Sequence, residues 1–288
     1  MLLEDVWFDI IAVVFKELAQ KRLDEFVLRS RQLGKEAGLK PKGKPHLDRM
    51  IADYKNGQVI EFWRYTNMLD GYDYTSKIYG LENLESTNNQ PTLIIANHPY
   101  GGPLRGHGQR FVLNHYVHKT TGKETRWLFG LDKTTPERFT RKRFVNQSSL
   151  IPVRDDDPKT SNKLILQALR NKDTIGINPE GDSNKTLLKA VPKATRMIIL
   201  SARHNYNIVC VATDFKNGAF FMSADPPLDN ERIKETRRIL NDKKDELNQL
   251  VSDYVMSRIA QHLPEEKRGY YTNFQKFIDA FAALTSTA

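Results

Sequence analysis

The sequence predicts an α/β fold: a mixed, mostly parallel central sheet flanked by helices, with an N-terminal helical annex. From Lys77 onward, short apolar runs alternate with segments of helical periodicity, and Gly, Pro or charged residues follow several of the runs directly. The 288 residues, 39% of them hydrophobic, suffice for one large α/β domain or two small ones. These figures argue against a repeat array or a disulfide-stabilised miniprotein.

Residues 1–75 are predicted to be mostly helical. Apolar residues recur at spacings of three and four over residues 3–18, which indicates an amphipathic helix. Charged residues interrupt this stretch, so it falls well short of the ~20 apolar residues that span a membrane. The helix either docks on the main domain or lies on a membrane with Trp7 and Phe8 at the interface. Residues 35–45, rich in Lys, Gly and Pro, are predicted to form a linker.

Six strands and four helices are predicted along the rest of the chain. The predicted strands cover residues 93–96, 127–130, 150–153, 174–177, 208–212 and 220–222. The predicted helices cover residues 105–119, 160–171, 189–204 and 230–262. Because strands alternate with helices, catalytic groups are expected in loops at strand ends. The main domain is expected to span residues 76–271, followed by a C-terminal helix or tail at 272–288.

The positive charge of the chain is concentrated in its middle third. Residues 105–203 hold 20 Lys and Arg against 9 Asp and Glu, a net charge of +11. Residues 1–104, with 13 against 14, and residues 204–288, with 11 against 12, each have a net charge of −1. The excess predicts a localised site for a nucleic acid, an anionic membrane, or a phosphorylated or acidic substrate. Nucleic-acid binding is not expected, because only residues 138–144, RFTRKRF, interleave basic and aromatic residues.

A single cysteine, Cys210, argues against an intramolecular disulfide framework and against a cysteine-rich metal site. No cleavable signal is recognisable at the N-terminus, so we expect a cytoplasmic protein or one that is peripheral on the inner membrane surface. His107, His115 and His118 are spaced to share one side of a helix. No carboxylate matches that spacing, so neither a metal nor another bound cofactor is expected.

The most informative stretch is LIIANHPYGG, at residues 93–102. An apolar strand ends there in Asn97 and His98, just before a turn with two glycines. A histidine at a strand end beside a flexible turn can reach a substrate, and the ordinary histidine pKa of ~6.5 suits proton abstraction near neutral pH. His98 is therefore a candidate general base; the alternative is a structural histidine that is hydrogen-bonded within the turn.

Two further predicted strands end in polar turns. In TIGINPEGDSNK the strand is followed by Glu180 and Gly181, an arrangement that exposes backbone N–H groups to anions. In SSLIPVRDDD the strand is followed by Arg154, whose guanidinium could grip a phosphate. The alternative for Arg154 is a surface ion pair with one of the three aspartates that follow it.

Together, these stretches resemble the glycerophospholipid acyltransferase superfamily. Its members share an NHx₄D block, an apolar strand that ends in Arg, a block similar to PEGTRS and a fourth apolar strand. The matching stretches here are ANHPYGG, SSLIPVR, NPEGDSNK and NIVCVATDF, and the resemblance covers residues 77–271. KIYGLENL, before the first block, and LPEEKRGYY, after the fourth, look like flanking features of bacterial relatives.

The resemblance implies transfer of an acyl group from acyl-CoA or acyl-carrier protein, as co-substrate, to the hydroxyl of a glycerol phosphate, lysophospholipid or related lipid. His98 would deprotonate that hydroxyl, and Arg154 would bind a phosphate of the acceptor. Glu180 and Gly181 would shape the acceptor site and help to fix the catalytic loop. A weakly acidic alcohol needs a positioned base, which agrees with the argument from the residues.

The sequence departs from the superfamily pattern in two blocks. Pro103 stands where the superfamily has the Asp that orients the histidine, and a shift of one or two positions meets Leu104 or Arg105. In the third block, Asp-Ser-Asn at 182–184 replaces Thr-Arg-Ser, with Lys185 directly after it. Both the orienting acid and one phosphate-binding arginine are therefore missing from their usual positions.

Two explanations of these departures remain open. In the first, Glu180 or Asp182 orients His98, while Arg105 or Lys185 binds the anion in place of the missing arginine. In the second, the chain keeps a lipid or CoA site without efficient turnover. Losing an orienting carboxylate costs ~10⁴ in rate in a serine protease, so the second explanation has physical support.

Overall fold

The protein is built around one seven-stranded sheet. The structure is a computed structural model that describes residues 39–85, 90–99, 108–130, 147–154, 156–181, 184–240 and 243–286. The strands are β1 (Ile78–Tyr79), β2 (Thr92–Ala96), β3 (Thr125–Gly130), β4 (Leu150–Val153), β5 (Thr174–Ile177), β6 (Asn207–Lys216) and β7 (Ala219–Ala224). Their order in the sheet is β1-β7-β6-β2-β5-β3-β4. β6 and β7 pair antiparallel and the other five pairings are parallel, which confirms the predicted mixed, mostly parallel sheet.

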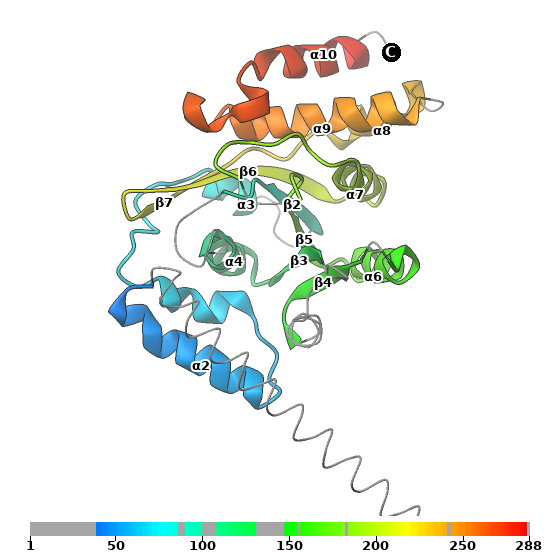
Figure 1. The fold of residues 1–288 in the computed structure, drawn as a ribbon. Coiled ribbons are helices and arrows are strands. Elements are labelled where there is room, and N and C mark those ends of the chain that lie inside the picture. Colours follow the sequence, from blue (N-terminus) through cyan, green and yellow to red (C-terminus); the bar gives the residue numbers. More distant parts are fainter. Residues whose placement is uncertain are drawn as a thin grey trace, which may run out of the picture.

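Helices cover both faces of this sheet. The α-helices are α2 (Lys44–Lys55), α3 (Leu81–Glu85), α4 (Gly108–Thr121), α6 (Pro158–Arg170), α7 (Pro192–Arg203), α8 (Asn230–Ile239), α9 (Lys244–Ala260) and α10 (Gln275–Ser286). The 3₁₀-helices are η1 (Pro41–Gly43), η2 (Phe62–Leu69), η4 (Glu265–Lys267) and η5 (Gly269–Tyr271). Helices α8, α9 and α10 lie on one side of the sheet, and α4 and α2 lie on the other (Figure 1). The described part of the chain therefore has three layers, with the sheet in the middle.

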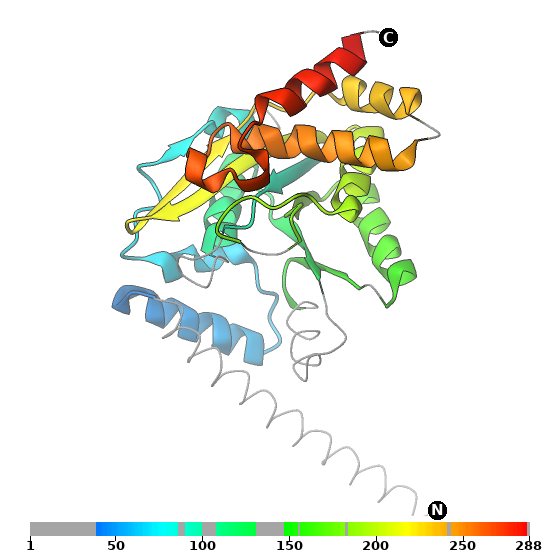
Figure 2. The ribbon, with the colours of Figure 1, turned by 45° about the horizontal axis from the view of Figure 1, so that its top comes forward.

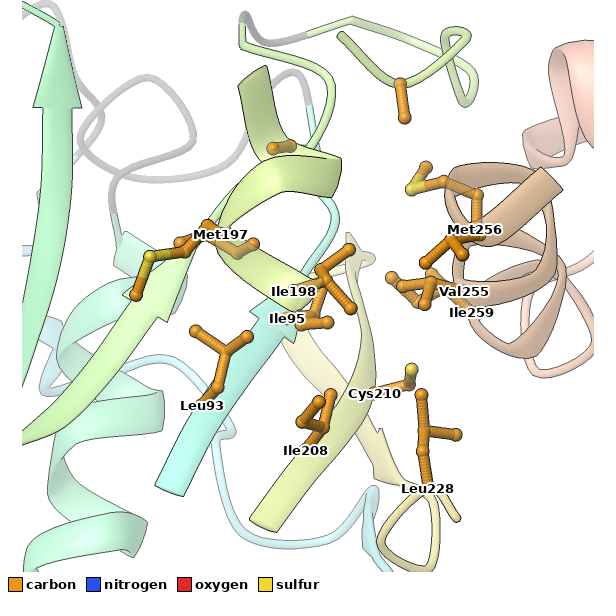
Figure 3. Close-up of a cluster of buried hydrophobic side chains, with 14 of the residues drawn as sticks. Leu93, Ile95, Met197, Ile198, Ile208, Cys210, Leu228, Val255, Met256 and Ile259 are labelled. Carbon is orange, nitrogen blue, oxygen red and sulfur yellow. The ribbon is translucent and has the colours of Figure 1, made fainter. Parts of the chain in front are cut away.

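The central strands β2 and β5 are buried along their whole length because both of their faces are covered. Along β2, Leu93 and Ile95 belong to one buried cluster and Ile94 and Ala96 to another, since successive side chains of a strand alternate. The first cluster packs against α6, α7 and α9. In Figure 3, Ile95 lies next to Ile198 of α7 within this cluster.

The second cluster lies between the sheet, α4 and the segment that precedes β1. Trp127 of β3 is fully buried there with residues of α2 and η2. The linker predicted over residues 35–45 is wrong in its described part, because Leu39 is buried and α2 already begins at Lys44. That helix forms because Leu47 and Ile51 lie one turn apart and face the same core.

All six predicted strands are present, whereas the helix predicted over residues 230–262 is two helices. Helix α8 ends at Ile239, and Leu240, with φ −99° and ψ 28°, leaves helical geometry. Both α8 and α9 contact α7. Asn241 and Asp242, between the two helices, are residue types that favour turns. The predicted helix over residues 3–18 lies outside the described residues.

Within the described ranges, no helix combines the length and the apolar character that crossing a bilayer requires.

The sheet topology creates a crevice at the carboxyl ends of β2 and β5. These strands are parallel neighbours, and the helices that follow them, α4 and α7, contribute to buried clusters on opposite faces of the sheet. Where connections leave adjacent parallel strands toward opposite faces, the space between the strand ends is open to a ligand. The polar residues that follow β2 and β5 border this crevice.

Candidate functional site

Asn97 anchors the loop that follows β2. Its side-chain Nδ2 donates to the carbonyl oxygen of Thr213 at 2.9 Å, and the Thr213 N–H donates to Asn97 Oδ1 at 2.7 Å. The amide thus takes the place of a peptide group and extends the β2–β6 pairing by one residue after the strand itself has ended. Asn97 is buried, so both of these hydrogen bonds are shielded from water.

His98 follows directly, and its main chain is held from both sides. Its N–H donates to Glu180 Oε2 at 2.7 Å, and its carbonyl oxygen accepts from the N–H of Asn184 at 3.3 Å. Both partners come from the segment after β5, which runs parallel to the His98 loop through a bridge between Pro99 and Asn184. His98 is 7% exposed, so its position is set by these contacts rather than by solvent.

The carboxylate of Glu180 is a structural hub of the loop. Besides the bond from His98, its Oε1 accepts the N–H of Leu188 at 2.9 Å. Burial raises the pKa of Glu180 to about 7, although the N–H donors of His98 and Leu188 act in the opposite direction. Among the hydrogen bonds that the structure describes, this carboxylate therefore binds the backbone of His98 and not its imidazole.

The turn between Asn178 and Gly181 brings Glu180 into this position. The N–H of Gly181 donates to the carbonyl oxygen of Asn178 at 3.1 Å, and Gly181 has a φ of +76°. A left-handed conformation of this kind is accessible to glycine and strained for most other residues. The PEG sequence thus supplies a buried carboxylate and the turn that directs it back toward β2.

A polar cluster supports the strand ends from the α4 side. Asn178 Nδ2 donates to the carbonyl oxygens of Ala96, at 2.8 Å, and Asn97, at 3.2 Å. Arg110 Nη2 in turn donates to Asn178 Oδ1 at 2.8 Å, and its guanidinium lies 5.5 Å from the ring centroid of Trp127. Arg110 is buried, and desolvation lowers its pKa to about 10. This cluster joins the first turn of α4 to the ends of β2 and β5.

A small pocket opens beside His98. It is lined by Asn97, His98, Pro99, Glu180, Asn184, Lys185, Thr186, Leu187, Thr213, Asp214, Leu263 and Lys267. The predicted residues His98, Glu180 and Lys185 therefore meet at one pocket. Its lining combines a histidine, two lysines, two carboxylates and apolar side chains. Lys267 is paired with Asp214, so Lys185 is the lysine of this lining that could bind an anionic group of a ligand.

Arg154 lies elsewhere, although it follows a parallel strand as predicted. Strand β4 is at the edge of the sheet, three strand positions from β2, which corresponds to about 14 Å between the strand axes. The guanidinium of Arg154 is bound by Asp156 through two contacts, Nε to Oδ1 at 3.2 Å and Nη2 to Oδ2 at 2.9 Å. The ion pair that the sequence offers as the alternative for Arg154 is thus present.

Two other predicted residues, Arg105 and Asp182, lie outside the described residues. Gly181 lies in the turn next to the pocket and carries no side chain that could contact a ligand.

Sequence reasoning missed two pocket residues, Asp214 and Lys267. Asp214 stands in the last part of β6, the neighbour of β2, and is 7% exposed. Lys267 follows α9 and forms an ion pair with Asp214, with 3.3 Å between Nζ and Oδ1. A signal for Asp214 was present, since it follows the apolar run of the fourth block. No sequence signal marked Lys267, because residues after α9 reach the ends of β2 and β6 only in the folded chain.

Of the other titratable residues that the sequence singled out, His115, His118 and Cys210 have structural surroundings, and His107 lies outside the described residues. The ring of His118 stacks on Trp63, with centroids 3.8 Å apart, and His115 meets Tyr74 edge to face. Among the described residues, no group of three His, Cys, Asp or Glu side chains is placed to hold a metal ion. Cys210 is fully buried, and burial raises the pKa of its thiol.

The likeness to known proteins lies in the fold. No protein-family model matches the sequence, and neither does any curated protein. Among solved structures, the crystal structure of the 1-acyl-sn-glycerophosphate (LPA) acyltransferase PlsC from Thermotoga maritima matches with a TM-score of 0.40 and 13% sequence identity. The match covers 90% of this chain and 99% of that chain. With identity and TM-score this low, the match does not indicate a reaction, which has to be argued from the residues of the site.

Proposed function

We propose that this protein is an acyltransferase that uses His98 as its general base. It moves a fatty acyl group from acyl-CoA or acyl-carrier protein to the hydroxyl of a glycerol phosphate, lysophospholipid or related lipid. The observation that carries the proposal is the meeting of His98, Glu180 and Lys185 at one pocket, at the carboxyl ends of β2 and β6 and beside the turn after β5. The order of the four sequence blocks supports the same reaction class.

The chemical step needs one base and no covalent enzyme intermediate. The imidazole of His98 removes the proton of the acceptor hydroxyl while the hydroxyl oxygen attacks the carbonyl carbon of the thioester. The C–S bond then breaks, and the thiolate leaving group takes the proton back from the imidazolium. Such positioned acid–base catalysis contributes about 10²–10⁴ in rate.

In this proposal, Glu180 is a positioning residue. Its carboxylate accepts hydrogen bonds from the N–H groups of His98 and Leu188. These bonds hold the loop of the base against the segment that carries Lys185. Lys185 supplies a cation at the pocket for the anionic group of a substrate. Arg154 is less suited to this role, because its Nε and Nη2 already donate hydrogen bonds to the carboxylate of Asp156.

A protein that binds lipid or CoA without turnover is the second candidate. The observation in its favour is Pro103, which stands where the superfamily keeps the acid that orients its histidine. This candidate predicts that the wild-type protein binds an acyl thioester and releases no more free thiol than the uncatalysed background.

The deciding experiment measures acyl transfer from a radiolabelled thioester to a panel of hydroxyl-bearing lipids. His98→Ala should lower kcat/KM by about 10²–10⁴ while the far-ultraviolet circular dichroism stays that of the wild type. His204→Ala, at the exposed end of α7, is the matched control and should keep full activity. Unchanged turnover in His98→Ala would reject the proposed mechanism.

A further inference from the structure

Two segments far apart in the sequence form one wall of the pocket. The first, residues 185–191, follows β5, and the second, residues 263–277, follows α9. We call them together the basic wall. Lys185, Leu187 and Lys267 of the wall line the pocket at His98. In Figure 2 the yellow-green stretch after β5 runs beside the orange-red segment that follows α9.

Main-chain hydrogen bonds make this wall a single unit. The N–H of Leu187 donates to the carbonyl oxygen of Lys267 at 2.9 Å, and the N–H of Tyr270 donates to that of Leu187 at 3.1 Å. Gly269 makes the contact possible, because a Cβ at that position would lie 2.3 Å from the Leu187 carbonyl oxygen. The backbones of the two segments therefore have fixed relative positions.

Two lysines of the wall lie over aromatic rings. Lys189 Nζ lies 5.7 Å from the ring centroid of Tyr270, and Lys276 Nζ lies 4.6 Å from that of Phe277. Tyr270 is 50% exposed and Val191 is 37% exposed, whereas Phe277 is partly buried against the core. The wall holds five Lys and Arg against two Asp and Glu, a net charge of +3.

This combination matches the interface of an anionic membrane. Tyr and Phe rings occupy the headgroup level of a bilayer, where one side of the ring contacts acyl chains and the other remains wet. Lysines beside them keep their stems on the apolar surface and their ammonium groups among the headgroups. Each such lysine near an anionic surface contributes about fivefold to binding, and the attraction is screened by salt.

We propose that the basic wall docks the protein on an anionic lipid surface and so turns the mouth of the pocket toward the bilayer. The inference rests on the proposed function, because a lipid acceptor resides in the membrane and its hydroxyl must reach His98. The wall borders the pocket, so a protein docked through it presents His98 to lipids without any described helix crossing the bilayer.

Vesicle binding tests the docking without any activity measurement. The full-length protein is sedimented with phosphatidylcholine vesicles that contain or lack phosphatidylglycerol. Wild-type protein should prefer the anionic vesicles and dissociate as salt is added. The triple variant Lys189→Glu, Tyr270→Ser, Lys276→Glu should bind at least about tenfold more weakly. None of its three positions lines the pocket.

A matched variant controls for charge and exposed area. Lys159→Glu and Lys163→Glu reverse two exposed charges on α6, and Tyr79→Ser removes a tyrosine that is 54% exposed on the edge strand β1. None of these residues belongs to the wall, and the variant that combines all three changes should bind anionic vesicles as the wild type does. Equal weakening in the two sets of variants would overturn the proposal, because it would indicate a nonspecific effect of net charge.

Activity measurements separate this inference from the proposed function. With a short-chain acceptor that is soluble in water, the triple variant should keep wild-type turnover, whereas with the same headgroup embedded in vesicles it should lose most of it. Equal loss on both acceptors would overturn the docking role. Unchanged vesicle binding together with a raised KM for acyl-carrier protein would also overturn it and assign the wall to an acidic protein. If the wild type turned over neither acceptor, the proposed function would fail while the vesicle measurements would still decide the docking.

Discussion

The carboxylate of Glu180 shows how burial and hydrogen bonding oppose each other in a single side chain. Two N–H donors stabilise its anion, yet it is only 5% exposed, and desolvation prevails. A group whose folded pKa exceeds its unfolded value holds a proton in the folded state that the unfolded chain has already released. Stability must then fall as pH rises between those two values.

This argument predicts a pH dependence that Glu180→Gln removes. In the wild type, Glu180 should lower the free energy of unfolding progressively between about pH 4.5 and about pH 7, by at most about 3 kcal/mol, with no further change above that range. Urea denaturation at a series of pH values measures the slope. Glu124, whose pKa burial also raises to about 7, contributes equally to both proteins and cancels in the comparison. Parallel pH profiles for the two proteins would contradict the prediction.

At the scale of single residues, the sequence indicates the pocket residues that directly follow strands. It does not indicate the pocket residues that reach the site only through tertiary packing. His98 and Glu180 were predictable, because an apolar run that ends in a polar turn marks the edge of a parallel sheet. The pairing of Glu180 with the backbone of His98, rather than with its ring, was not, since it depends on the left-handed turn at Gly181. Lys267 could not be predicted, because its place at the pocket depends on how α9 packs.

At the scale of elements, the strands were the most predictable part. Each of the six predicted strands is a short apolar run between polar turns, and a parallel strand that is buried on both faces has few other sequences available to it. Strand β1, two residues long and partly exposed, was not predicted. The division of residues 230–262 into α8 and α9 was not predictable from periodicity. Both helices have to follow the curved surface of α7 and the sheet, and that surface exists only in the folded protein.

Close packing between β5 and β3 gives a prediction at this scale. A Cβ on Gly176 would lie 2.5 Å from the ring of Trp127, its direct partner in the sheet. Gly176→Ala should therefore lower the free energy of unfolding by about 1–3 kcal/mol. It should also reduce turnover, because Trp127 lies against Arg110, which supports the end of β2 through Asn178. Chemical denaturation and kcat measure the two effects.

Gly130→Ala is the control for this substitution. Gly130 ends β3, and a Cβ there would meet nothing within 4 Å. Its stability should stay within about 0.5 kcal/mol of the wild type. Similar losses in both variants would mean that the alanine acts through the flexibility of the strand and not through contact with Trp127.

At the scale of the whole molecule, one buried tyrosine links the basic wall to α9. The Tyr271 hydroxyl donates to Asp253 Oδ1 at 3.0 Å and accepts the N–H of Ala190 at 3.3 Å. Tyr271→Phe would leave both buried groups without this partner, so we expect a loss of about 1–3 kcal/mol and a raised KM for the acceptor. Tyr270→Phe, which alters a half-exposed hydroxyl next to it, should change neither; a comparable loss there would contradict this account.

Basic residues from two segments of the sequence lie together in the folded molecule. Lys185 and Lys189 belong to the segment with a net charge of +11, but Lys267, Arg268 and Lys276 come from a segment whose net charge is −1. Folding gathers these five basic residues on one side of the pocket, in a wall that holds only two acidic residues. A count along the chain therefore misses part of the positive charge beside the pocket, because it does not show which segments folding brings together.

The crossing of residues 185–191 with residues 263–271 also bears on protein synthesis. A ribosome adds residues in order, and the strands that carry His98 and Glu180 emerge long before Leu263 and Lys267 have been made. The nascent chain can pair β2 with β5, but it lacks one side of its pocket until the segment after α9 leaves the exit tunnel. Ligand binding, and with it the fixed position of the wall, should therefore arise only after residues 263–271 have left the exit tunnel.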